Sequence, residues 1–189
     1  MRPHPDFPRI SAALSRVPLR GWQGVAFRSS TPAYSASRDL LSGEGVRRHG
    51  GRWNPPGIFA AVYASLTPET ALAEALGRFR EYGIAVADAM PRVLTALEIE
   101  VEALADLTCP RARQALKVSK SRMRSEPWRR ATEEGREAVT QAIGRAAFER
   151  GLEGLLVFSA PDPAGRNLVL FPVRLRPGSR LLVRTPTAH

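Results

Sequence analysis

A glycine-rich segment that leads into a capped helix restricts the folding of this chain more than any other stretch. It reads SGEGVRRHGGRWNPPGIFAAVYASLTPETALAEALGRF, from Ser42 to Phe79. Its glycines permit positive φ angles, and backbone amides beside them can approach an anion closely; they are Gly43, Gly45, Gly50, Gly51 and Gly57. The same loop carries the basic residues Arg47, Arg48, His49 and Arg52. The segment therefore predicts an irregular, basic loop rather than a regular element.

The second half of this segment predicts a strand followed by a helix. Ile58 to Ala64 is apolar and is typical of a buried strand, with Tyr63 near its end. Thr67 and Pro68 predict the start of a helix, because threonine caps helices and proline fits their first turn. We expect this helix to reach about Arg80.

The expected helix has one apolar face. Leu72, Leu76 and Phe79 are spaced at four and three residues, which places them on the same side. Glu74 falls on the other side. By periodicity alone, Glu74 is a solvated carboxylate.

Local patterns predict further elements outside this segment. Strands are expected at Trp22–Ser30, Leu97–Glu102, Leu155–Ala160, Val169–Leu175 and Arg180–Val183. The strand at residues 97–102 is the clearest, because apolar and acidic residues alternate along it. Helices are expected at Ser37–Leu41 and Glu134–Arg150, with short helices and a loop between Asp106 and Glu133. Gly151 follows the second helix where a C-terminal cap belongs.

These elements predict a single domain of the α+β class. Strands occur before, between and after the helices, without the regular alternation of a doubly wound fold. The sheet is expected to be mixed and largely antiparallel. We divide the chain into an N-terminal lead-in, residues 1–20, and one domain, residues 21–189, because 189 residues fit one core.

The sequence favours a cytoplasmic protein without membrane insertion. No apolar run approaches the roughly 18 residues that span a bilayer. The N-terminal residues 1–17 contain charges and prolines where a secretory signal needs an unbroken apolar core. The single cysteine, Cys109, cannot form an internal disulfide, which agrees with a reducing compartment.

The net charge of +10 raises the possibility of an anionic partner. Residues 110–150 contain 11 Lys or Arg against 5 Asp or Glu, so +6 of the excess lies there. Such a region can attract phosphates or an acidic protein, and the sequence does not distinguish them. The role of the basic loop at residues 117–130 stays open.

Common cofactor signatures are missing from the sequence. Arg48 stands where a G-x-G-x-x-G pattern beginning at Gly43 needs its third glycine, and there is no Walker A sequence. The histidines His4, His49 and His189 are far apart, so their spacing predicts neither a metal site nor a catalytic triad.

The order of several short motifs resembles the RES domain family. These motifs are FR, SGEG, GGRWNPPG, VYAS, ALAE and a late strand that ends in a serine, between Gly21 and Arg176. The family is named for an arginine, a glutamate and a serine. In this chain the resemblance assigns those roles to Arg28 or Arg52, to Glu74 and to Ser159.

The resemblance implies a fold similar to ADP-ribosyltransferase toxins and membership of a bacterial toxin–antitoxin pair. Its members act on NAD, which is a substrate, so no separate cofactor and no metal are expected. The implied partner is an Xre-like antitoxin with a helix-turn-helix part, through which most DNA contact would occur. A homodimer is left open.

Cleavage of the nicotinamide–ribose bond requires three kinds of group. Arg28 and Arg52 are candidates to bind the diphosphate, and Tyr63 is a candidate to stack on the nicotinamide. Glu74 is the candidate carboxylate for the oxocarbenium-like transition state. Candidate hydrogen-bonding residues for the ribose or the amide are Ser159, Asn54 and Asn167.

Two other functions remain open at this point. A mono-ADP-ribosyltransferase that modifies a host protein would use the same residues and change only the acceptor, which is otherwise water or phosphate. A basic nucleic-acid-binding module without catalysis would explain the charge, although no recognisable binding motif accompanies it.

Overall fold

The computed structural model describes residues 1–81, 83 and 85–184, so His189 lies outside the described residues. The described strands are β1 Leu19–Ser30, β2 Val62–Ser65, β3 Val93–Asp106, β4 Gly154–Phe158, β5 Arg166–Leu170 and β6 Arg180–Val183. The α-helices are α1 Phe7–Leu14, α2 Ser37–Ser42, α3 Glu44–His49, α4 Pro68–Glu81, α5 Pro110–Leu116, α6 Lys120–Ser125, α7 Trp128–Glu133 and α8 Val139–Glu149. Short 3-10 turns lie at Pro32–Tyr34, Val86–Ala89 and Pro172–Arg174.

Five of these strands form a closed ring. The strand order is β1-β2-β5-β4-β3, and β1 also pairs with β3, which closes the sheet. β6 pairs with β3 outside the ring. The pair β3–β4 is parallel and the other pairs are antiparallel. The expected single α+β domain with a mixed sheet is confirmed. The expectation of a simple, largely antiparallel sheet is wrong, because five strands close on themselves.

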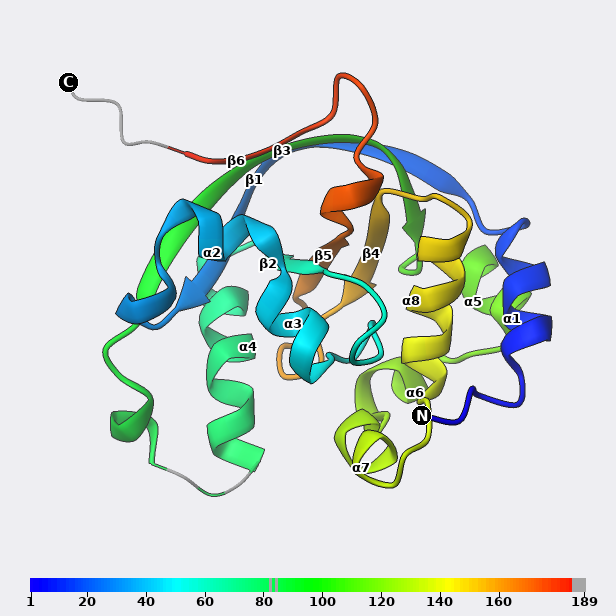
Figure 1. Ribbon diagram of the computed structural model, residues 1–189, viewed down its shortest axis with the longest axis horizontal. Helices are drawn as coiled ribbons and strands as arrows, with labels where there is room; N and C mark the ends of the chain where they lie inside the picture. Colours follow the sequence, from blue (N-terminus) through cyan, green and yellow to red (C-terminus); the bar gives the residue numbers. More distant parts are fainter. Residues whose placement is uncertain (82, 84, 185–189) are drawn as a thin grey trace.

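The two longest strands form the back of the ring. β1 and β3 pair from Leu19 opposite Ala105 to Ser30 opposite Val93, with a shift in register between Arg20 and Trp22. They arch together over the other strands in Figure 1. The alternation predicted at residues 97–102 is confirmed, because Leu97, Ile99 and Val101 are buried while Glu98 and Glu102 are exposed.

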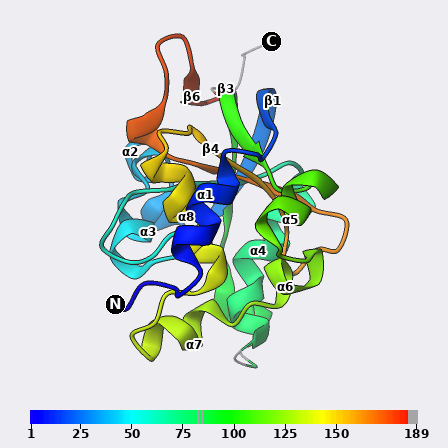
Figure 2. The ribbon, with the colours of Figure 1, turned by 90° about the vertical axis from the view of Figure 1, so that its right-hand side faces the viewer.

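Two apolar clusters lie on opposite faces of the strands. One contains residues from every strand, among them Ala26, Val62, Leu97, Leu156, Leu168 and Leu181. The other lies between the sheet and the helices and includes Ile10, Leu14, Ile143, Leu155 and Phe171. Figure 2 shows α1 beside α8 and α5, so the N-terminal residues complete this second cluster.

Several boundaries differ from the prediction for local reasons. The strand expected from Ile58 begins only at Val62, although Phe59 and Ala60 are buried. The strand expected to reach Leu175 ends at Leu170, because Pro172 cannot donate a ladder hydrogen bond and starts a 3-10 turn. The strand expected to reach Ala160 ends at Phe158.

The helix predicted from Thr67 and Pro68 is confirmed as α4, but its buried face matches the predicted one only in part. Leu72 is 41% exposed, whereas Thr70, Ala71 and Leu76 are buried. Glu74 lies three residues after Ala71 and is half-buried on this inner side. The predicted outward orientation of Glu74 is therefore wrong.

The remaining helices are confirmed in position, but the helix expected from Glu134 begins only at Val139, because Glu134 and Gly135 form a turn after α7. α2 lies at the site of the short helix expected at residues 37–41, and α8 ends before Gly151, whose φ is 73°. The basic region forms the short helices α5, α6 and α7. No helix among the described residues is long and apolar enough to cross a membrane.

Candidate active site

A cavity of about 740 Å³ lies at one end of the closed sheet. Its walls come from the end of β1, the loop after α3, β2, the inner side of α4, the loop after β4, the start of β5, and α7. Figure 1 shows α4 and α7 on either side of the loop that joins β4 to β5. The polar or ionisable lining residues are Arg28, Ser29, His49, Arg52, Tyr63, Ser65, Glu74, Trp128, Arg129, Thr132, Glu133 and Asn167.

Glu74 lines this cavity, and three hydrogen-bond donors hold one oxygen of its carboxylate. The Ser159 hydroxyl donates to Oε1 at 2.7 Å, and the Asn167 amide donates to it at 2.6 Å. The backbone N–H of Ala160 donates to the same oxygen at 3.3 Å. Every hydrogen bond that the described residues make to this carboxylate therefore ends on Oε1. This leaves Oε2 available to a ligand.

The loop after β4 places Ser159 beside this carboxylate. Its N–H donates to Gly165 O, and its side-chain oxygen accepts from the N–H of Asp162 at 3.1 Å, which closes a tight turn. Thr70 of α4 donates to Asp162 at 2.6 Å, so the turn is tied to the helix that carries Glu74. This hydrogen bond lowers the pKa of Asp162. A side chain at Gly165 would contact Asp162 and Thr70, so glycine is required there.

Strand register places Asn167 beside the same carboxylate. Ser65 of β2 and Asn167 of β5 are direct cross-strand partners. The Ser65 hydroxyl donates to Asn167 Oδ1 at 2.7 Å, which fixes the amide so that its nitrogen faces Glu74. Both side chains are buried and satisfied, and such pairs orient their neighbours.

Arg28 lies at the end of β1 and lines the cavity. Its Nη1 donates to the carbonyl of Tyr63 at 3.0 Å. Burial lowers the pKa of this guanidinium, but an arginine remains charged throughout the physiological range. Arg28 therefore places a positive charge in the cavity wall.

Tyr63 connects the cavity to the glycine-rich loop. Its hydroxyl donates to Asn54 Oδ1 at 2.8 Å and accepts from the N–H of Trp53 at 2.9 Å. Burial raises the pKa of Tyr63 strongly, against the smaller opposite effect of the Trp53 amide. The hydroxyl is thus a neutral structural link, and Tyr63 also lines the cavity. Any side chain at Gly51 would collide with this hydroxyl, which explains the glycine.

Arg52 follows in the same loop and ties it to the basic region. Its Nη1 donates to the carbonyls of Glu126 at 2.9 Å and Met123 at 3.3 Å. Both carbonyls belong to the end of α6 and the residue after it. Arg52 consequently lines the cavity while it positions the segment that leads to α7.

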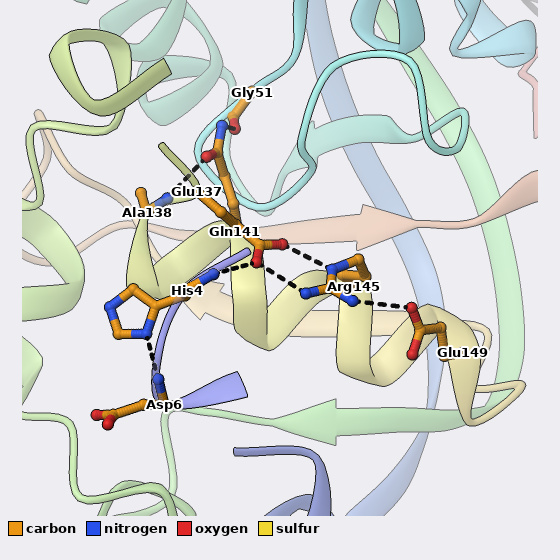
Figure 3. Close-up of polar contacts among 8 residues, drawn as sticks. All are labelled: His4, Asp6, Gly51, Glu137, Ala138, Gln141, Arg145 and Glu149. Atoms are coloured by element: carbon orange, nitrogen blue, oxygen red, sulfur yellow. Dashed lines mark hydrogen bonds and ion pairs between the residues drawn. The ribbon is translucent and has the colours of Figure 1, made fainter. Parts of the chain in front are cut away.

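Gln141 of α8 supports the same loop from behind, as Figure 3 shows. Its amide nitrogen donates to Gly51 O and to the Thr132 hydroxyl, each at 3.1 Å, and its oxygen accepts from the N–H of Ala138 at 3.0 Å. Farther along α8, Arg145 pairs with Glu137, which also accepts from the N–H of His4 at 2.8 Å. These hydrogen bonds therefore connect α8 and the residues just before it to the glycine-rich loop, to α7 and to the N-terminal residues.

The structure brings five of the seven candidate residues into one cavity. Arg28, Arg52, Tyr63, Glu74 and Asn167 line it. Ser159 and Asn54 are fully buried behind it, where they hold Glu74 and Tyr63 respectively. No group of three or more potential metal ligands is assembled within residues 1–81, 83 and 85–184.

Several lining residues were not identified from the sequence. Ser65 could have been found, because it lies two residues after Tyr63 and so shares its face of β2. No local signal points to Trp128, Arg129, Thr132 or Glu133, which reach the cavity only through the packing of α7.

Comparisons with known proteins agree with one another. A family model described as the RES domain matches residues 25–188. The chain is 32% identical over 173 residues to proteins called NAD(+) phosphorylase MbcT from Mycobacterium bovis and Mycobacterium tuberculosis, which covers 87% of this chain and 84% of each relative. It also resembles one chain in the crystal structure of the M. tuberculosis MbcT–MbcA toxin–antitoxin complex. That match has a TM-score of 0.72 and 27% identity, over 93% of this chain and 89% of the other.

Proposed function

Because this chain belongs to the RES domain family, we propose that it is the toxin of a bacterial toxin–antitoxin pair and that it degrades NAD. The reaction is cleavage of the nicotinamide–ribose bond, with inorganic phosphate as acceptor. The choice of phosphate rests on the relatives called NAD(+) phosphorylase. Water is the alternative acceptor, and a protein side chain is the acceptor of the mono-ADP-ribosyltransferase alternative.

The observation that carries this proposal is the carboxylate of Glu74 in a cavity that also contains Arg28 and Arg52. Loss of nicotinamide leaves positive charge on the ribose, and a fixed carboxylate stabilises that charge. Oε1 is already bound by three donors, so Oε2 is the oxygen assigned to the ribose. The arginines are assigned to the diphosphate, whose geometry a guanidinium matches.

The proposed reaction balances without a metal or an external oxidant. The bond from ribose C1 to the nicotinamide nitrogen breaks, and its electron pair neutralises the pyridinium. An oxygen of hydrogen phosphate forms the new bond to C1. The products are neutral nicotinamide and ADP-ribose 1-phosphate. With water as the acceptor, the products would be neutral nicotinamide, ADP-ribose and one released proton.

The ring of Tyr63 is assigned to the nicotinamide, and Asn167 is assigned to holding Glu74 rather than the substrate. Ser159 and Asn54 are also supporting residues, since both are buried and hold Glu74 and Tyr63 respectively. His49 and Trp128 line the cavity, but neither is given a role in the reaction.

The proposed partner is an Xre-like antitoxin that represses the common operon, so that DNA contact belongs mainly to the partner. The relative in the crystal structure is part of a toxin–antitoxin complex, which supports a protein partner of this kind. A fold relationship with ADP-ribosyltransferase toxins and a cytoplasmic location complete the proposal, and a homodimer remains an option.

Nicotinamide release by the purified chain tests the proposal. The wild type is incubated with NAD, with and without inorganic phosphate, and the products are separated and followed by ³¹P NMR. We expect phosphate-dependent nicotinamide release and a new phosphate ester. Glu74→Gln should lower kcat by about 100-fold or more, because the carboxylate charge is lost.

Glu69→Gln is the matched control, since Glu69 is exposed on the same helix and loses the same charge. It should retain the wild-type rate. A folded wild type that releases no nicotinamide, with or without phosphate, would exclude the proposed function. Nicotinamide release that is independent of phosphate would identify water as the acceptor. If NAD labelled in its adenosine is used, transfer of the label to a protein would favour the transferase.

A further inference from the structure

Arg124 lies in the basic region whose role the sequence leaves open. It belongs to α6, and its guanidinium is turned toward the loop after β4. Nε donates to the carbonyl of Ser159 at 2.9 Å, and Nη2 donates to the carbonyl of Ala160 at 3.0 Å. The planar fork of this arginine therefore binds two successive peptide carbonyls.

The peptide group between Ser159 and Ala160 links Arg124 to Glu74. Its carbonyl accepts from Arg124, and its N–H donates to Oε1 of Glu74. Because a peptide group is planar, a hydrogen bond that fixes the oxygen also fixes the direction of the N–H. The bond to a cation polarises the same group and strengthens its N–H as a donor. Ser159 adds its hydroxyl to Oε1, so both donors from this loop depend on one short backbone segment.

Arg124 reaches Glu74 only through this backbone. It is not among the residues that line the 740 Å³ cavity. It lines instead a shallow depression on the outer side of the loop, with Lys120, Ser121, Ser125 and Ala160. A substrate in the cavity would thus be separated from Arg124 by the loop itself.

We propose that Arg124 is a positioning residue for Glu74. It fixes the backbone at Ser159 and Ala160, so that Oε1 is held and Oε2 is directed toward the ribose. The inference rests on the proposed function for the reactive role of Glu74. The hydrogen bonds from Arg124 to the backbone, called here the backbone grip, do not depend on the substrate. One residue of the basic region thereby acquires a role that involves neither nucleic acid nor a protein partner.

Steady-state kinetics of Arg124→Gln and Arg124→Lys test this proposal. We expect each to lower kcat by about 10-fold and to leave the KM for NAD within about 2-fold, because a misplaced carboxylate slows the chemical step without removing a substrate contact. Lysine keeps the charge but lacks the planar fork, so it should resemble glutamine rather than the wild type. Arg111→Gln, an exposed arginine of α5 in the same basic region, is the matched control and should behave as the wild type.

Two kinetic outcomes would overturn the proposal. If Arg124→Lys keeps the wild-type kcat while Arg124→Gln and Arg111→Gln lose it equally, the charge of the basic region matters and the fork does not. If the KM for NAD rises while kcat is unchanged, Arg124 contacts the substrate.

Hydrogen exchange provides a measurement that needs no catalysis. The N–H of Ala160 is bonded to Glu74, and the N–H of Asp162 is bonded to Ser159. Both should exchange about 10-fold faster in each Arg124 variant than in the wild type or in Arg111→Gln, because the segment opens more readily. Unchanged exchange would refute the backbone grip, whatever the activity. Faster exchange in a protein that does not consume NAD would uphold the grip and refute the proposed function alone.

Discussion

The hydroxyl of Tyr63 joins two parts of the site that belong to different elements. It bonds the N–H of Trp53 and the side chain of Asn54, both in the loop before β2. Asn54 is fully buried, and its amide nitrogen donates onward to the carbonyl of Val46. One phenol hydroxyl therefore fixes the loop that carries Arg52, and the same residue lines the cavity.

Tyr63→Phe should lower the free energy of unfolding by about 1–3 kcal/mol near pH 8, because it leaves a buried N–H and a buried carbonyl oxygen without a partner. Burial raises the pKa of Tyr63, so the folded state favours the protonated phenol. That stabilisation is complete below the unfolded pKa of about 10 and is lost as the pH rises above it. Urea unfolding of both proteins at about pH 8 and about pH 10.5 should therefore show a smaller difference at the higher pH.

Tyr34→Phe is the control for this measurement, since Tyr34 is 68% exposed. It should match the wild type at both pH values. A Tyr63→Phe variant as stable as the wild type, or a difference that does not shrink with pH, would contradict the assigned role of the hydroxyl.

At the scale of elements, α8 determines where the glycine-rich loop lies. Gln141 bonds the carbonyl of Gly51, and three residues later Gly144 packs directly against the backbone of Trp53. The helix and the loop approach so closely that a Cβ at position 144 would overlap the Trp53 carbonyl. The absence of a side chain at position 144 therefore allows α8 to pack directly against the glycine-rich loop.

Gly144→Ala should lower the free energy of unfolding by about 2 kcal/mol or more. Alanine favours a helix over glycine by about 1 kcal/mol, but forcing an atom into a packed contact costs more. Gly45→Ala is the matched control, because Gly45 lies in α3 with open space at its Cβ position. Thermal melts should show Gly45→Ala unchanged or slightly stabilised, and equal melting temperatures for the two variants would disprove the close contact.

At the scale of the whole molecule, Glu153 links the closed sheet to the C-terminal residues. The carboxylate accepts from the N–H groups of Glu102 and Ala103 on β3 and from that of Arg176, at 2.7–3.1 Å. Burial by itself would raise the pKa of Glu153, but the nearby Ser179 side chain and then these backbone N–H groups outweigh it and lower the pKa. The side chain is fully buried, and its hydrogen bonds join β3 to the C-terminal residues.

Glu153→Gln should lower the free energy of unfolding by about 2 kcal/mol at neutral pH, because an amide cannot accept from all of these donors. The lowered pKa gives the wild type a stabilisation that is present above the unfolded value of 4.5 and is lost as the pH falls through the folded value. Urea midpoints should therefore converge in acid. Glu98→Gln, on the exposed side of β3, should change the urea midpoint little at either pH. A difference in midpoint between Glu153→Gln and the wild type that stays constant with pH would contradict the role assigned to Glu153.

Much of the fold follows from patterns that span a few residues. The start of α4 depends on Thr67 and Pro68, the end of α8 on Gly151, and the exposure of β3 on strict alternation. Closure of the ring was not predicted, because it requires β1 to pair with both β2 and β3, and no local pattern encodes a second pairing partner.

The sequence by itself determined the order of the elements, the family to which the chain belongs, and the residue types from which the site is built. Tertiary structure decided what those residues do. Glu74 accepts its two shortest hydrogen bonds from Ser159 and Asn167, which are 85 and 93 residues away along the chain. Helical periodicity depends only on near neighbours, so it placed this carboxylate in solvent, whereas the packing of α4 against the end of the sheet placed it in the cavity. The same long-range packing brought Arg124 to the loop that holds Glu74.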